Sequence, residues 1–112
     1  MRRLITPLIA AAILGCGGGN GEVTIAQLAQ SQQDFVGQRV TTRGQVRHER
    51  DPDGRAYYVL ADAHGMLVGL EPEGAARAFE GRSVQVIGVF DFEQGFGRVI
   101  HIAAIRPSTG GG

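Results

Sequence analysis

The chain has 112 residues, enough for one domain, and 43% of them are hydrophobic, enough for a small core. Its formal net charge is zero, and all eleven basic residues are arginine. Because nucleic-acid-binding domains draw much of their affinity from a basic excess that neutralises phosphates, this balance argues against strong nucleic-acid binding.

The first fifteen residues have the features of a secretory signal. A basic start, Met1–Arg3, precedes an apolar run over Leu4–Leu14, which is shorter than the ~20 residues a helix needs to span a bilayer. The run ends in Ile13-Leu14-Gly15-Cys16, which resembles the lipobox of bacterial lipoproteins. The resemblance implies that residues 1–15 are removed and that Cys16 carries lipid. The alternative is an ordinary signal peptide in which Cys16 is incidental.

Residues 16–23 are rich in glycine and predict a flexible tether between lipid and domain. Two or three acyl chains hold a protein stably on a membrane, since each buried CH₂ contributes ~0.8 kcal/mol. We therefore expect an extracytoplasmic protein of the bacterial cell envelope, with the membrane as its partner through Cys16. Gly17 rather than Asp follows Cys16, and in bacteria with two membranes the resemblance then favours the outer one. Loss of Arg2 and Arg3 would leave a net charge near −2.

Short helix and strand patterns follow the tether. Thr24 and Gln27 have capping-box spacing and predict a helix over residues 25–32. Arg39–Arg47 alternates small or apolar residues with polar ones and predicts a long strand, bent at Gly44. Turn residues separate the later segments. The expected strands cover residues 39–47, 56–61, 66–70, 83–90 and 98–105, and a second helix covers 72–80.

This order, with a helix between the third and fourth strands, resembles the OB-fold, a five-stranded Greek-key barrel. The resemblance covers about residues 35–105. It is carried by Phe35-Val-Gly-Gln-Arg-Val40, by Tyr58-Val-Leu-Ala-Asp62 with Gly65, and by Gly81-Arg-Ser-Val-Gln-Val-Ile-Gly88. We expect an all-β domain with short helices over residues 24–107 and a disordered tail over 108–112. The competing fold is an SH3-like barrel, which usually lacks that helix.

OB-folds commonly bind ligands on the outer face of strands two and three, between the loops that join strands one to two and four to five. In this sequence the resemblance places arginines and aromatic residues there, a chemistry suited to stacked bases or sugar rings. The alternative is a solvated arginine stripe beside aromatic residues that close the domain. The candidate ligand-binding residues are Arg43, Gln45, Arg47, Tyr57, Val59, Phe92 and Phe96.

Other chemistries have weaker support in the sequence. Glu49–Gly54 has part of a calcium-loop pattern, but Leu60 stands where the closing glutamate is needed. His48, His64 and His101 lack metal-ligand spacing and the His-to-Tyr spacing of an envelope OB-fold family that carries haem. None of the three serines after the signal lies in a glycine-flanked elbow. We therefore expect no metal site, no cofactor and no catalysis.

The sequence favours a lipid-anchored binding module that acts in protein interaction or assembly. Its near-neutral charge and extracytoplasmic placement favour this role. The alternative is binding of an oligosaccharide, nucleic acid or small ligand on the face of the first three strands. A small envelope enzyme or metal-binding protein is the remote alternative.

Overall fold

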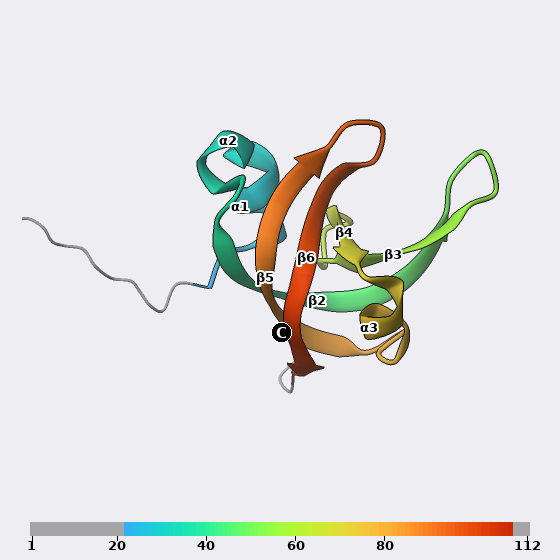
Figure 1. The fold of residues 1–112 in the computed structure, drawn as a ribbon. Coiled ribbons are helices and arrows are strands. Elements are labelled where there is room, and N and C mark those ends of the chain that lie inside the picture. The colour runs from blue at the N-terminus through green and yellow to red at the C-terminus, as the bar shows by residue number, and fades with distance from the viewer. Residues whose placement is uncertain (1–21, 109–112) are drawn as a thin grey trace, which may run out of the picture.

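The computed structural model describes residues 22–108 and is mainly β-structure (Figure 1). The predicted signal segment 1–15, Cys16, most of the predicted tether and all but the first residue of the predicted tail lie outside the described residues. The elements in chain order are α1 (Ile25–Gln30), α2 (Gln32–Phe35), β2 (Arg39–Arg50), β3 (Ala56–Ala61), β4 (Leu67–Glu71), α3 (Glu73–Arg77), β5 (Ser83–Glu93) and β6 (Gly97–Pro107).

The five strands form one sheet that closes on itself in the order β2-β3-β4-β6-β5. Neighbouring strands are antiparallel except β4 and β6, which are parallel. β2 closes the ring because its first half, residues 39–45, pairs with β5 and its second half, residues 45–50, pairs with β3. Gly44, where the sequence predicts a bend, lies next to this change of partner. A Cβ at Gly44 would lie 2.6 Å from the carbonyl oxygen of Ala61, so the backbones of β2 and β3 approach closely there.

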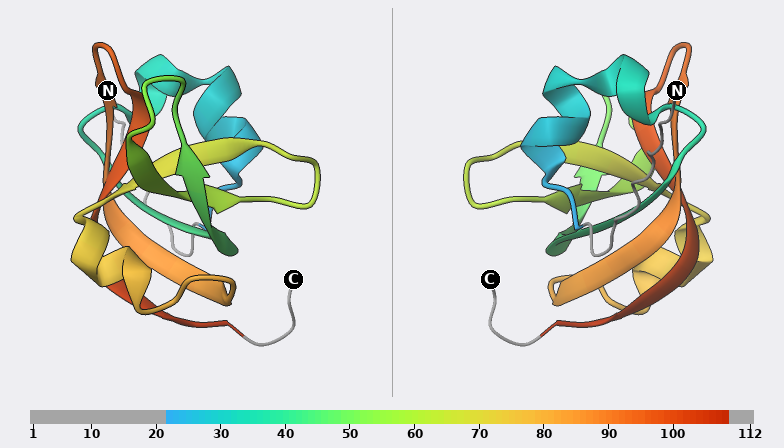
Figure 2. Two further views of the ribbon diagram at one scale, coloured as in Figure 1. Left: turned by 90° about the vertical axis from the view of Figure 1, so that its right-hand side faces the viewer. Right: turned by 90° about the vertical axis from the view of Figure 1, so that its left-hand side faces the viewer.

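Side chains that alternate along the strands fill the interior of the closed sheet. Val40, Thr42 and Val46 of β2 are buried, as their spacing predicts, while the intervening arginines are exposed. Ile25 and Leu28 of α1 and Ala76 of α3 join the same core. Figures 1 and 2 show α1 and α2 at one end of the sheet and α3 at the opposite end. The helices thus cover the two openings and leave the outer strand faces as surface.

The observed elements differ from the predicted ones at their ends. The first predicted helix is two short helices, because Ser31 leaves the helical region and ends α1. α3 is shorter than predicted, and the chain continues in turns to Gly81. β2, β5 and β6 are longer, because pairing extends into both hairpins as far as Arg50–Ala56 and Glu93–Gly97. Among residues 22–108, no helix has the length and apolar character needed to cross a membrane.

Candidate functional site

An open groove of about 900 Å³ lies between the β2–β3 loop and the β5–β6 loop. Both hairpin tips project to the same side of the molecule (Figures 1 and 2). A hollow of this volume lies within the range of roughly 300–1,000 Å³ that small-molecule sites occupy. The groove is lined by Arg55, Ala56, Tyr57, Leu70, Glu71, Pro72, Glu73, Glu93, Gln94, Gly95, Phe96, His101 and Ile102.

Carboxylates outnumber cations in this groove. Glu71, Glu73 and Glu93 line it, and Arg55 is the one arginine among its described lining residues. Glu73 also pairs with Arg77 at 3.5 Å. Tyr57 and Phe96 form an aromatic wall, with their rings edge to face and their centroids 5.6 Å apart. A negative groove attracts cationic groups and repels polyanions such as nucleic acid.

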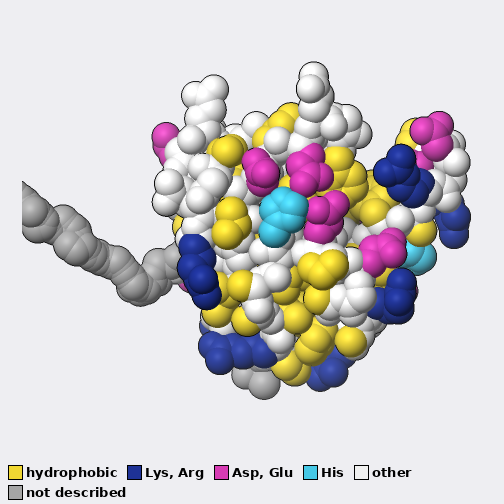
Figure 3. Space-filling view, in the orientation of Figure 1, with side chains coloured by type: hydrophobic (Ala, Val, Ile, Leu, Met, Phe, Trp, Pro, Cys, Tyr) yellow, Lys and Arg dark blue, Asp and Glu magenta, His cyan; other side chains and the backbone are white. Residues whose placement is uncertain are grey.

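One histidine, His101, lies among carboxylates in the wall of the groove. His101 Nδ1 is 3.4 Å from Glu71 Oε1, and His101 Nε2 is 3.2 Å from Glu93 Oε2. Asp91 Oδ2 is 3.9 Å from the same Nε2. In Figure 3 a histidine is surrounded by acidic side chains on the face where β5 and β6 lie. One ligand atom from each of Glu71, Glu93 and His101 can be chosen so that all lie within 4.8 Å of one another.

Strand alternation explains why these side chains meet. Glu71, Asp91 and His101 each follow a core residue, respectively Leu70, Phe90 and Ile100, so alternation turns them to the outer face. Glu71 pairs with His101 across the parallel β4–β6 contact. Sequence reasoning missed this cluster because its members have no short-range spacing, and only the register of three strands brings them together.

Four of the seven predicted ligand-binding residues lie together. Tyr57, Val59, Phe92 and Phe96 line a smaller hollow of about 200 Å³ next to the groove. Val59 is 2% exposed although it points away from the core, whereas Phe92 is 47% exposed. Arg47 is the direct β2 partner of Val59, but its guanidinium pairs with Glu49 at 3.2 Å.

Phe96 covers the outer face of β4. A Cβ at Gly69 would lie 2.6 Å from Phe96 Cε2, so the ring packs directly on this glycine. The β5–β6 loop therefore occupies part of the face on which the sequence predicts a ligand. The open surface next to the β5–β6 loop is the acidic groove. It is not the arginine-lined surface that the sequence predicts.

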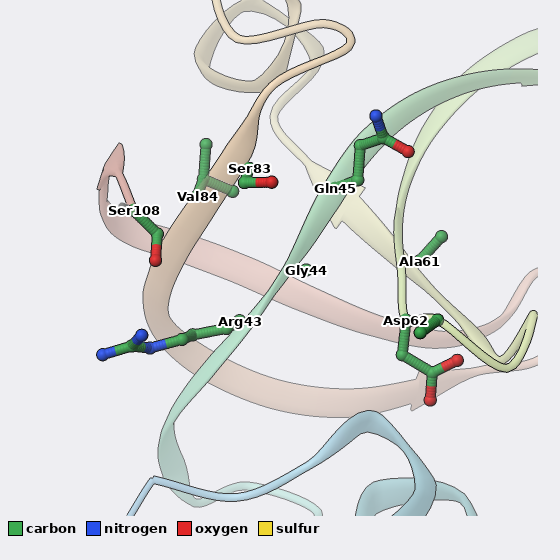
Figure 4. Close-up of a pocket in the computed structure, with 9 residues that line it drawn as sticks. Arg43, Gly44, Gln45, Ala61, Asp62, Ser83, Val84 and Ser108 are labelled. Atoms are coloured by element: carbon green, nitrogen blue, oxygen red, sulfur yellow. The ribbon is translucent and has the colours of Figure 1, made fainter. Parts of the chain in front are cut away.

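Arg43 and Gln45 lie elsewhere, beside a separate hollow of about 340 Å³ (Figure 4). Arg43 Nε donates to Glu22 Oε2 at 2.8 Å, and Gln45 Nε2 donates to the carbonyl oxygen of Gly81 at 3.1 Å. Figure 4 shows Arg43 and Asp62 pointing away from each other on either side of Gly44. Asp62 instead accepts hydrogen bonds from the backbone N–H groups of His64 and Met66 and holds the β3–β4 turn.

The pKa of the Glu22 carboxyl is lowered below its usual value. The hydrogen bond from Gln85, at 2.9 Å, is the larger cause, and the hydrogen bond from Arg43 adds to it. The guanidinium of Arg43 is thus paired with an ionised carboxylate of its own chain.

The loop that partly matches a calcium pattern is a hairpin turn in the structure. Asp51 N–H donates to the carbonyl oxygen of Arg55, and Asp51 Oδ1 accepts from Arg55 N–H. Arg50 also donates to the carbonyl oxygen of Gly54. At least one carboxylate of the loop therefore serves to hold the turn.

No protein-family model matches the chain, and no curated protein shows significant sequence similarity to it. The candidate site is therefore assigned from its own geometry and charge.

Proposed function

We propose that the protein is a lipid-anchored OB-fold module of the bacterial cell envelope, which binds a partner protein and performs no catalysis. Two features support the OB-fold. Along the chain, α3 lies between β4 and β5, which are the third and fourth strands of the closed sheet in sequence order. The β2–β3 and β5–β6 loops flank a groove.

The lipobox-like sequence before Cys16 supports the anchor. The described residues begin at Glu22, six residues after Cys16. Six extended residues reach at most about 20 Å. A lipid on Cys16 would therefore hold the domain close to the membrane surface, where its partners would be membrane or envelope components.

The acidic groove is the observation that carries the binding role. Glu71, Glu73 and Glu93 line it together with the aromatic wall of Tyr57 and Phe96. A basic segment of a protein matches this surface, because lysine and arginine can pair with the carboxylates while their aliphatic stems pack on the rings. No serine or cysteine among residues 22–108 lines the groove, which favours binding over nucleophilic chemistry.

Oligosaccharide binding is the second candidate. The edge-to-face pair of Tyr57 and Phe96 beside hydrogen-bonding carboxylates favours it, since sugar rings combine apolar faces with hydroxyl donors. Nucleic acid is disfavoured on the same surface by charge.

Site-specific cross-linking in cells that make the full chain tests the proposal. A photoreactive residue at Gln94, in the groove, should give discrete cross-linked proteins, and the pair Glu71→Gln and Glu93→Gln should abolish them. The control position is His64, in the exposed turn at the opposite end of β3. Identical products from both positions would contradict a groove-specific partner. Products digested by glycosidase but not by protease would favour oligosaccharide instead.

A further inference from the structure

We propose that Glu71, Glu93 and His101 form a binding site for a divalent transition metal, with Zn²⁺ as the preferred ion. The site lies on the outer face of the sheet, where β4, β5 and β6 each contribute one ligand. The inference goes beyond the proposed binding role, although Glu71 and Glu93 also line the acidic groove to which that role is assigned.

The distances suit a zinc ion after small side-chain movements. Zn²⁺ takes nitrogen and oxygen ligands at ~2.0–2.2 Å, so neighbouring ligand atoms of a tetrahedral site lie about 3.4 Å apart. Because only one imidazole nitrogen can bind a given ion, the spacing of one ligand atom from each residue decides the fit: His101 Nε2 lies 3.2 Å from Glu93 Oε2, and one atom each of Glu71, Glu93 and His101 lie within 4.8 Å of one another. The Glu71 carboxylate, which contacts His101 Nδ1 at 3.4 Å, must turn toward the ion. All three side chains are about 40% exposed, so their outer torsions are free to adjust.

Charge supplies a second argument. Glu71, Asp91 and Glu93 surround an imidazole that can carry at most one positive charge. Within residues 22–108, no arginine lies at ion-pair distance from any of these three carboxylates. Carboxylates held on neighbouring strands of one sheet repel each other, and a divalent cation would relieve that repulsion.

The types of ligand atom in the site determine which class of metal ion it would bind. An imidazole with carboxylates suits Zn²⁺, Mn²⁺ and related ions, whereas Ca²⁺ prefers six to eight oxygen ligands. Asp91 Oδ2, 3.9 Å from His101 Nε2, is close enough to add a fourth ligand or an outer-shell hydrogen bond. Three protein ligands would leave a position open toward the groove, which Glu71, Glu93 and His101 line.

Calorimetric titration of the purified full chain with ZnCl₂, MnCl₂ and CaCl₂ tests the proposal. We expect one Zn²⁺ per chain, bound more tightly than Mn²⁺ as the Irving–Williams order requires, and bound at least about tenfold more tightly than Ca²⁺. His101→Asn should weaken Zn²⁺ binding by at least about tenfold. The matched control, His64→Asn, removes an exposed imidazole from the β3–β4 turn and should leave the affinity unchanged.

Circular dichroism checks that each variant is folded, and Glu93→Gln provides a second site variant if His101→Asn is not. Co²⁺ substitution gives an independent readout, since the visible absorption of bound Co²⁺ should change in either site variant. Failure of the native chain to bind Zn²⁺ would overturn the proposal. So would equal Zn²⁺ affinity in a folded site variant, or binding of Ca²⁺ as tight as that of Zn²⁺, because either result would reduce the site to a patch of surface charge.

Discussion

Gly44 lies in the long strand β2, next to the point where the pairing partner of this strand changes from β5 to β3. Its neighbour Gln45 pairs with both β5 and β3. The backbone of β3 at Ala61 lies close to Gly44. Only a residue without a side chain fits this approach, because the nearest atoms belong to backbone and to the buried side chain of Leu60. Gly44 thus permits the close approach of β2 and β3 at the point where β2 changes its partner.

We therefore expect Gly44→Ala to lower the free energy of unfolding by about 1–3 kcal/mol, the usual cost of overpacking. The matched control is Gly74→Ala in α3, where a new Cβ would meet nothing within 4 Å. That change should be neutral or stabilising by up to about 1 kcal/mol, since alanine favours helix over glycine. Urea denaturation of both variants measures the difference. Equal stabilities would mean that the close approach at Gly44 does not constrain the fold.

Glu22 ties the start of the domain to β2 and β5 through Arg43 and Gln85. Because these contacts lower its pKa, Glu22 stabilises the fold at pH values above its usual pKa of 4.5, and this contribution is lost as the pH falls through the lowered value. The Glu22→Gln variant should therefore be less stable than the native chain at pH 7 by less than about 1 kcal/mol, since the pair is exposed.

The difference in unfolding free energy between the native chain and Glu22→Gln should shrink when urea unfolding is measured at pH 3. Asp53→Asn, in the exposed β2–β3 loop, serves as the control for general charge effects. A Glu22→Gln deficit that stays constant between pH 7 and pH 3 would contradict a role for the ionised carboxylate.

At the scale of the elements, α1 depends on a reciprocal pair of hydrogen bonds at its start. The Thr24 hydroxyl accepts from Gln27 N–H at 3.0 Å, and the Gln27 side chain accepts from Thr24 N–H at 2.8 Å. The helix they begin carries Ile25 and Leu28 into the core. The cap thus holds in place the helix that covers one end of the sheet.

Thr24→Ala should lower the free energy of unfolding by about 1 kcal/mol, the typical cost of losing an N-cap. Ser31→Ala is the matched control, because Ser31 precedes α2 without a side-chain cap bond. That variant should change stability by less than about 0.5 kcal/mol. Chemical denaturation distinguishes the two, and a Ser31 effect as large as the Thr24 effect would show that the capping box does not contribute.

The elements that the sequence predicts correctly have local signals. The capping box, the alternation of β2 and the Asp62 turn each depend on residues a few positions apart. Packing of Phe96 on Gly69 and the meeting of Glu71 with His101 depend instead on strand register between distant segments. A single sequence does not specify that register. The candidate ligand residues could therefore be named from the sequence, but it could not be predicted that they lie on separate surfaces.

For the whole molecule, the N-terminal sequence and the groove support two different tasks. Cys16 lies shortly before the first described residue, Glu22, and supports a proposal of membrane attachment. The groove between the two hairpins offers carboxylates and aromatic rings to a partner. Attachment would restrict that partner to molecules at the membrane surface, so the proposed localisation determines where a search for it should begin.

The most direct test is metabolic labelling of bacteria that make the full chain with a clickable palmitate analogue, beside a Cys16→Ser variant. We expect the native chain to take up label and to fractionate with membranes, and the variant to lose both properties while retaining the fold. A native chain without label, or a Cys16→Ser chain that is still labelled, would contradict a lipid anchor at Cys16.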